Sequence, residues 1–201
     1  MNVNKNNLLV SEAASGDSTR QALQAVYFDA DGTVATSGYI LIKIGYPEQV
    51  DLTEMPAPIP QGSDKITPFL VSAEACKGLG KAIPKVKQVP ALNNLFIDVA
   101  ATNANDCAHF VATDLESPQS IAIKKLEHAF PPYAQAMPKP EAVTLTIGFD
   151  PELMARVCGV AKKMGLENCK FEFTNDKGPC KITGLDKHGQ EFTALVMPKQ
   201  I

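Results

Sequence analysis

Two carboxylates stand two residues apart in the segment 28–34, which reads Phe-Asp-Ala-Asp-Gly-Thr-Val. Asp29 and Asp31 follow an apolar stretch, residues 25–28, that we expect to form a strand. Two carboxylates two residues apart at a strand end can share a hard cation such as Mg²⁺. Asp-Ala-Asp-Gly is also good chemistry for a hairpin turn. The residues alone therefore allow either a metal-dependent site or a turn.

This segment is similar to the first motif of haloacid dehalogenase-like phosphatases. The resemblance implies that Asp29 is the nucleophile, that Asp31 is the general acid/base, and that both help to hold Mg²⁺. That family also needs a downstream Gly-Asp-x-x-x-Asp motif, and no clear copy occurs here. Nor does the chain show the alternating strands and long helices of a doubly wound fold. The phosphatase is kept as the alternative, and the chain is not expected to be an enzyme.

Other residues suggest no further chemistry. His109, His128 and His188 are scattered without ligand spacing, so no metal site and no cofactor is expected. Nothing marks a nucleophile elbow, and residues 36–38 lack the glycine spacing and the lysine of a phosphate loop.

The composition is that of a soluble globular protein, with 45% hydrophobic and 20% charged residues. No apolar run is long enough to cross a bilayer, and the polar start lacks the apolar core of a signal peptide. Five cysteines without a CxxC pair indicate reduced thiols, mostly buried, in a cytoplasmic protein. The net charge of −3 gives no signature of nucleic-acid binding over the whole chain, but a local basic stripe remains compatible with it.

Two segments predict a strand that leads into a helix. In the first, residues 68–71 precede a helix capped by Ser72, with Cys76, Leu79 and Ile83 at helical spacing. In the second, residues 143–149 alternate as a strand before a helix that starts at Asp150 and Pro151. Its predicted buried stripe consists of Leu153, Val157, Val160, Ala161 and Met164.

Hairpins are expected after each helix. The last third predicts strands at 169–173, 180–185 and 191–197, and the middle third at 95–99, 108–113 and 121–126. In the first third, a short helix near residues 8–14 precedes a hairpin of residues 25–28 and 33–44. We therefore expect an α+β fold of three βαβββ-like units: two in a domain of residues 1–129 with a Pro-rich insert at 46–61, a linker at 130–141, and a half-domain at 142–201.

Several segments, in order along the chain, resemble bacterial DNA sliding clamps, the beta subunit of DNA polymerase III. Residues 34–41, Val-Ala-Thr-Ser-Gly-Tyr-Ile-Leu, are similar to the family's Val-Ala-Thr-Asp-Gly-His-Arg-Leu. Residues 69–75 resemble the strand and helix start of a domain's second unit, and residues 130–138 resemble the Phe-Pro-Asp-Tyr…Pro linker. The ending Val-Met-Pro, within residues 194–201, resembles the family's final strand. The resemblance implies a DNA-clamp-type fold with antiparallel sheets backed by helices.

The resemblance also implies function: a replication processivity or docking factor that is a homo-oligomer, binds double-stranded DNA without sequence specificity, and docks polymerases and other partners. By matching position, its peptide-binding pocket is expected from Leu23, Thr36, Gly38, Tyr39, Leu41, Pro138, Val196, Met197 and Pro198. DNA contact is expected from Lys77, Lys81, Arg156, Lys162 and Lys163.

The sequence departs from the family in two ways. A complete clamp chain has three domains, whereas this sequence provides one domain and the last half of another. In the predicted pocket, Ser37, Tyr39 and Ile40 replace Asp, His and Arg, and Gln200 replaces a terminal arginine. The polarity of the pocket, and therefore its choice of partners, is expected to differ.

Overall fold

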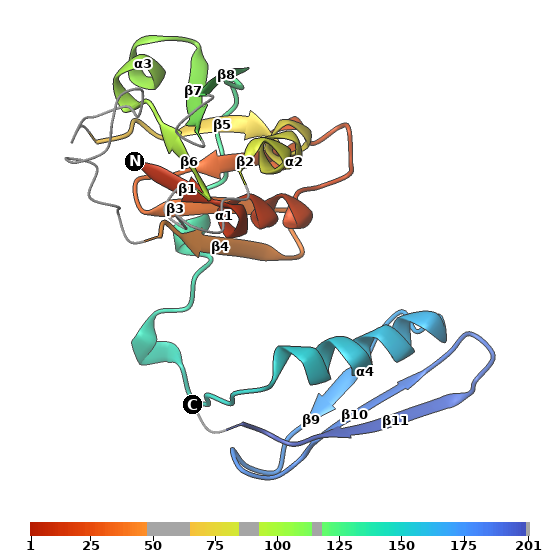
Figure 1. Ribbon diagram of the computed structural model, residues 1–201. Helices are drawn as coiled ribbons and strands as arrows, with labels where there is room; N and C mark the ends of the chain where they lie inside the picture. The colour runs from red at the N-terminus through yellow and green to blue at the C-terminus, as the bar shows by residue number, and fades with distance from the viewer. Residues whose placement is uncertain (48–64, 85–92, 114–117, 200–201) are drawn as a thin grey trace. The chain divides into compact units, whose positions relative to one another are not determined.

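The computed structural model describes residues 1–47, 65–84, 93–113 and 118–199 (Figure 1). Internal contacts divide the chain into two units, Met1–Tyr133 and Ala134–Ile201. This division falls inside the segment 130–141 that the sequence marks as a linker. Almost all of the Pro-rich insert at 46–61 lies outside the described residues.

The first unit contains two repeats that share the order strand, helix and three strands, and the second repeat has an additional short helix between its last three strands. The first repeat consists of β1 (Asn2–Asn4), α1 (Lys5–Leu9) with the 3₁₀ turn η1 (Val10–Ala13), the 3₁₀ turn η2 (Gln21–Gln24), β2 (Ala25–Phe28), β3 (Gly32–Thr36) and β4 (Leu41–Gly45). The second consists of β5 (Phe69–Ser72), α2 (Ala73–Ala82), β6 (Asn94–Ile97), α3 (Val99–Ala104), β7 (Cys107–Ala112) and β8 (Gln119–Lys124).

The two repeats exchange their first strands. One sheet has the order β4-β3-β2-β5 and the other has the order β1-β6-β7-β8. Strand β1 therefore pairs with β6 of the second repeat, with Val3 opposite Leu95, and β5 pairs with β2 of the first, with Val71 opposite Val26. All of these pairings are antiparallel, and the exchange ties the two repeats into one body.

The helices and the sheets of this unit share one core. Helix α2 begins at Ser72, whose hydroxyl accepts a hydrogen bond from the Ala75 backbone N–H (3.1 Å), and it buries Cys76 and Leu79. Phe28 and Phe69 stack with ring centroids 4.9 Å apart, and Phe110 meets Phe28 edge-on. The predicted helix cap at Ser72 is confirmed, and so is the predicted burial of Cys76 and Leu79.

The second unit contains a single repeat. It consists of the 3₁₀ turn η5 (Pro140–Ala142), α4 (Pro151–Lys163), β9 (Lys170–Glu172), β10 (Cys180–Leu185) and β11 (Glu191–Val196); a further 3₁₀ turn, η4 (Tyr133–Gln135), stands at the boundary of the units. Figure 1 shows α4 lying along one face of the three-stranded sheet β11-β10-β9. The buried core is small and consists of Ala161, Cys180, Ile182, Phe192 and Val196.

Several predictions about this second unit are confirmed. Helix α4 begins where expected, because the Asp150 carboxylate accepts a hydrogen bond from the Glu152 backbone N–H (2.8 Å) and Pro151 occupies the first turn. The three strands lie within the predicted segments. The overall α+β class, with repeated units and antiparallel sheets, is also as expected.

Two predictions about this unit are wrong. Residues 143–149 form no strand, and their large side chains Val143 and Leu145 are exposed. On α4, Leu153 and Val160 are exposed as well, and the face toward the sheet is instead made by Met154, Val157, Ala161 and Met164. Both errors have one physical cause. An alternating apolar strand and a wide apolar stripe become buried only when a second repeat covers them, and this unit has one repeat.

Smaller corrections concern the first unit. The predicted strand 33–44 is broken into β3 and β4 by a turn, and the predicted strand 95–99 ends at Ile97 because Asp98 caps the short helix α3. The sequence reading identified neither α3 nor β1. All five cysteines are free thiols; Cys76 and Cys180 are buried, and Cys158 is exposed. No helix within the described part of the chain is both long and apolar enough to cross a membrane.

Candidate peptide-binding and DNA-contact surfaces

The turn between β3 and β4 carries much of the predicted peptide pocket. The Thr36 hydroxyl donates to the Ile40 carbonyl (2.7 Å) and accepts from the Gly38 N–H (3.0 Å). Gly38 has φ of +89°, a conformation that side chains disfavour, so glycine suits this position. The tight turn holds Tyr39 outward, where 89% of its surface is exposed. An aromatic ring presented in this way is available to a partner.

A hollow of about 470 Å³ lies beside this turn in the first unit. Leu23 borders it, and a methyl group added at Gly38 would stand 3.9 Å from the Leu23 side chain and 3.5 Å from the Arg20 guanidinium. Leu41 pairs with Thr36 across the β3–β4 ladder. The five predicted pocket residues of this unit are therefore neighbours. The full lining of the hollow is Thr19, Arg20, Gln21, Ala22, Leu23, His128 and Pro131.

The remaining predicted pocket residues belong to the second unit. Val196 is buried in the core, whereas Met197 has 60% of its surface exposed and Pro138 is exposed in the linker. Pro198 borders a hollow of about 540 Å³ together with residues 146–148, Asp176, Lys177 and Lys199. The predicted pocket thus consists of two groups, one on each unit.

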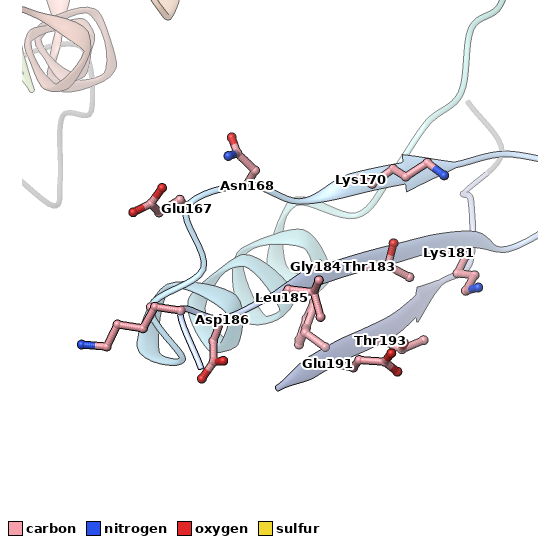
Figure 2. A pocket seen from close by; sticks show the side chains of 13 residues that line it. Glu167, Asn168, Lys170, Lys181, Thr183, Gly184, Leu185, Asp186, Glu191 and Thr193 are labelled. Carbon is pink, nitrogen blue, oxygen red and sulfur yellow. The ribbon is translucent and has the colours of Figure 1, made fainter. Parts of the chain in front are cut away.

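Sequence reasoning missed Arg20 and His128, which border the Leu23 hollow. Neither has a sequence signal of its own, because Arg20 follows a polar loop and His128 is an isolated histidine. Sequence reasoning also missed a hollow of about 720 Å³ on the second unit, where Lys170, Lys181 and Glu191 contribute to the lining (Figure 2). Lys181 and Thr183 alternate with the core residues Cys180 and Ile182, so they lie on the sheet face that points away from the core.

The predicted DNA-contacting cations are exposed on two helices. On α2, Lys77 lies 3.4 Å from the Glu12 carboxylate, and Lys81 is exposed one turn later. On α4, Arg156 pairs with Glu152 one turn earlier, while Lys162 and Lys163 are exposed in the last turn. Lys77 and Arg156 therefore have nearby carboxylates that reduce the local positive charge. Exposed pairs of this kind contribute little to stability.

Asp29 and Asp31 have structural partners. The Tyr133 hydroxyl donates to the Asp29 carboxylate (2.6 Å), and the Tyr46 hydroxyl donates to the Asp29 carbonyl (2.9 Å). Asp31 forms an ion pair with Lys43 (2.8 Å). Within the described residues, no cluster of three or more acidic, histidine or cysteine side chains suited to a metal ion is found.

These contacts attach the start of the linker to the first unit. The Tyr27 ring stacks on Phe130 with centroids 4.9 Å apart, and Tyr133 meets both rings edge-on. Burial, followed by the hydrogen bond to Asp29, raises the pKa of Tyr133. The hydrogen bond to Asp31 raises the pKa of Lys43. The Asp-Ala-Asp-Gly segment therefore acts here as a turn that anchors the linker. The antiparallel sheets of this unit also differ from the doubly wound α/β fold that the phosphatase resemblance implies.

Comparison with solved structures identifies the fold. The chain is similar over 99% of its length to half (50%) of the beta sliding clamp of Caulobacter crescentus, with a TM-score of 0.65 and 16% identity. It is also similar over its full length to 49% of the DNA polymerase III beta chain of Streptococcus pneumoniae, with a TM-score of 0.66 and 15% identity. The sliding clamp of Bacillus subtilis gives a TM-score of 0.65 at 12% identity, again with 100% of this chain and 49% of that one covered.

The structure thus has the fold of bacterial beta sliding clamps, and the chain spans about half the length of the clamps that it matches. No protein-family model matches the sequence, and no curated protein matches it. In the C. crescentus structure, polyethylene glycol is bound at a region described as tethering the beta-motif.

Proposed function

We propose that this chain is a non-enzymatic, clamp-like docking factor of DNA replication that binds short peptide segments of partner proteins. The observation that carries this proposal is the match of nearly the whole chain to sliding clamps. In the clamp from C. crescentus, polyethylene glycol occupies the region described as tethering the beta-motif, so the same fold can hold a flexible chain there.

The exposed side chains at the two predicted groups suit peptide capture. Tyr39 on the first unit and Met197 on the second are large and apolar and are held at the surface. Methionine adapts its shape to different partners, and tyrosine offers a large contact area with few rotatable bonds. Because Ser37 and Tyr39 stand where the family has Asp and His, we propose that this site selects apolar and aromatic anchors.

A labelled peptide containing glutamine followed by a Leu-Phe-type apolar pair provides the test. In fluorescence anisotropy we expect saturable binding with a Kd on the order of micromolar, or about −8 kcal/mol. Met197→Ala should weaken this binding about tenfold or more, since an apolar anchor of the site is removed. Tyr39→Ala should do the same.

Leu185→Ala is the matched control, because Leu185 has the same 60% exposure as Met197 and belongs to no predicted pocket position. It should leave the Kd unchanged. Absence of binding by the wild-type chain, or equal losses in Met197→Ala and Leu185→Ala, would contradict the docking proposal and leave only the fold.

A second candidate is a clamp-fold adaptor that binds proteins but not DNA. It is favoured by the carboxylates that accompany Lys77 and Arg156. If the chain does bind duplex DNA, the affinity should fall steeply with salt, and Lys163→Glu should reduce both affinity and salt dependence. Lys187→Glu changes the net charge equally on an exposed hairpin turn and should have little effect. Salt-independent or undetectable binding would favour the protein-only adaptor.

A further inference from the structure

We propose that the second unit is completed by the second unit of another copy of this chain. The two copies exchange residues 143–149 and pack their α4 helices together, which makes one two-repeat domain from two single repeats. This proposal goes beyond the docking function and does not depend on it.

The first unit shows how two repeats of this fold combine. In each of its sheets, three strands come from one repeat, and the fourth is the first strand of the other repeat. The incoming strand always pairs, antiparallel, with the first strand of the sheet that follows the helix: β5 with β2, and β1 with β6. The helices α1 and α2 also contact each other. Each repeat is thus finished by its neighbour.

The sheet of the second unit lacks a corresponding fourth strand among the described residues. Its sheet is β11-β10-β9, and β9 is the counterpart of β2 and β6. No described strand pairs with the other side of β9, which is where the first strand of a second repeat would lie. Unpaired strand edges of this kind readily accept another strand.

The strand that should be exchanged is also present and unpaired. Residues 143–149 precede α4 as β1 precedes α1 and β5 precedes α2, yet they join no sheet. The Lys199 N–H donates to the Gly148 carbonyl (2.9 Å), so the end of this segment is held beside the chain that follows β11. Its alternating Val143 and Leu145 are exposed. This segment therefore has the sequence of a strand and lacks a sheet.

Helix α4 has an exposed apolar flank. Leu153 and Val160 lie seven residues apart and so share one side of the helix, with 43% and 51% of their surfaces exposed. They adjoin the sheet-facing Val157 and Met164. A second helix packed on this flank, as α1 packs on α2, would cover them.

A second copy is the occupant whose charges fit. If the twofold axis runs perpendicular to the two α4 helices, they pack antiparallel, and Leu153 of one copy lies opposite Val160 of the other. The acidic first turn with Glu152 then adjoins the basic last turn with Lys162 and Lys163 of the other copy.

Sedimentation equilibrium of the full chain tests the proposal. We expect a species of twice the monomer mass of 21.6 kDa at micromolar concentrations. Leu153→Asp and Val160→Asp should each raise the dimer dissociation constant at least tenfold, because a charge would be buried in the interface. Leu185→Asp places the same charge on another exposed leucine of this unit, outside the proposed interface, and should leave the dimer intact. Circular dichroism verifies that all three variants fold.

Hydrogen exchange tests the strand exchange itself. In the dimer, the amides of residues 143–149 should be protected, and the protection should disappear in Leu153→Asp. A chain that stays monomeric at 100-fold higher concentrations, or a dimer that Leu153→Asp and Val160→Asp leave unchanged, would overturn the proposal. A dimer with unprotected residues 143–149 would also overturn it. Peptide binding by the monomer would leave the docking function standing.

Discussion

At the scale of single residues, Asp29 separates a structural interpretation from a catalytic one. Its carboxylate accepts hydrogen bonds from the Tyr133 hydroxyl (2.6 Å) and from the Ala30 backbone N–H (2.7 Å). A hydrogen bond to a charged acceptor stabilises the folded state by about 1–2 kcal/mol where it is partly shielded from water. The aspartate that resembles a nucleophile is therefore expected to matter for stability.

A double-mutant cycle on Asp29 and Tyr133 measures this contribution. Asp29→Ala and Tyr133→Phe should each lower the free energy of unfolding of the first unit by about 1–2 kcal/mol, with a coupling energy of about 1 kcal/mol. Asp31→Ala, which breaks an exposed ion pair with Lys43, should cost less than about 1 kcal/mol. Urea unfolding of the three single variants and of the double mutant gives these three changes and the coupling energy. Additive effects of the first pair would show that the observed hydrogen bond does not anchor the linker.

Alkaline pH should destabilise the first unit through two other residues. Burial raises the pKa of the Cys76 thiol to about 12, and burial, followed by the charges of Asp29 and Asp31, raises the pKa of Tyr46. Both groups are neutral when protonated, so the unfolded chain loses these protons first, from about pH 9 for the thiol and pH 10 for the phenol. Stability is full below about pH 9 and falls as pH rises toward the folded-state pKa values.

Unfolding by urea between pH 8 and pH 11 measures this loss. Each group should contribute up to about 1.4 kcal/mol per pH unit once its unfolded form is ionised. Tyr46→Phe should make the decline shallower above pH 10, although it also removes the hydrogen bond to the Asp29 carbonyl. An unchanged slope in Tyr46→Phe would mean that the phenol is not protected by folding.

At the scale of elements, the sequence predicted those features that depend on a few neighbouring residues, such as the starts of helices. Ser72 and Asp150 identified the starts of α2 and α4, because a capping side chain satisfies free backbone N–H groups within a few residues. The alternation of residues 143–149 predicted a strand that is not formed, because a strand exists only when another strand pairs with it. The sequence of this segment does not show whether such a partner strand is present.

The two helix caps allow the stability of the units to be tested separately. Asp150→Ala should destabilise the second unit by about 1 kcal/mol, since the hydrogen bond to the Glu152 N–H is lost. Ser72→Ala is the counterpart in the first unit, where the hydrogen bond to the Ala75 N–H is lost. Hydrogen exchange should show each variant opening faster only in its own unit. Faster exchange in both units for either variant would indicate that they unfold together.

At the scale of the whole molecule, the prediction of a peptide pocket depended on segments that resemble sliding clamps and follow the same order along the chain. Leu23, Thr36 and Gly38 lie near one another on the first unit, at a tight turn and a hollow, and their role in a pocket stays a prediction. The order of segments could not identify Arg20 or His128, since their proximity depends on how loops return to the same place. Fold-level resemblance suggests where a site lies, but the chemistry of its lining depends on side chains that the fold does not determine.

The whole molecule contains two separate cores of unequal size, and this suggests two unfolding transitions. The second unit, with its single repeat and exposed apolar flank, should unfold first on heating. If a second copy completes it, only this transition should depend on protein concentration, because association stabilises the folded form by mass action. A tenfold increase should raise its Tm by about 5 °C and leave the Tm of the first unit unchanged.

Scanning calorimetry of the wild type and of Leu153→Asp measures both unfolding transitions. In the variant, the lower Tm should no longer depend on concentration. A wild-type lower transition that is equally independent of concentration would mean that the single repeat folds without a partner, despite its exposed Leu153 and Val160.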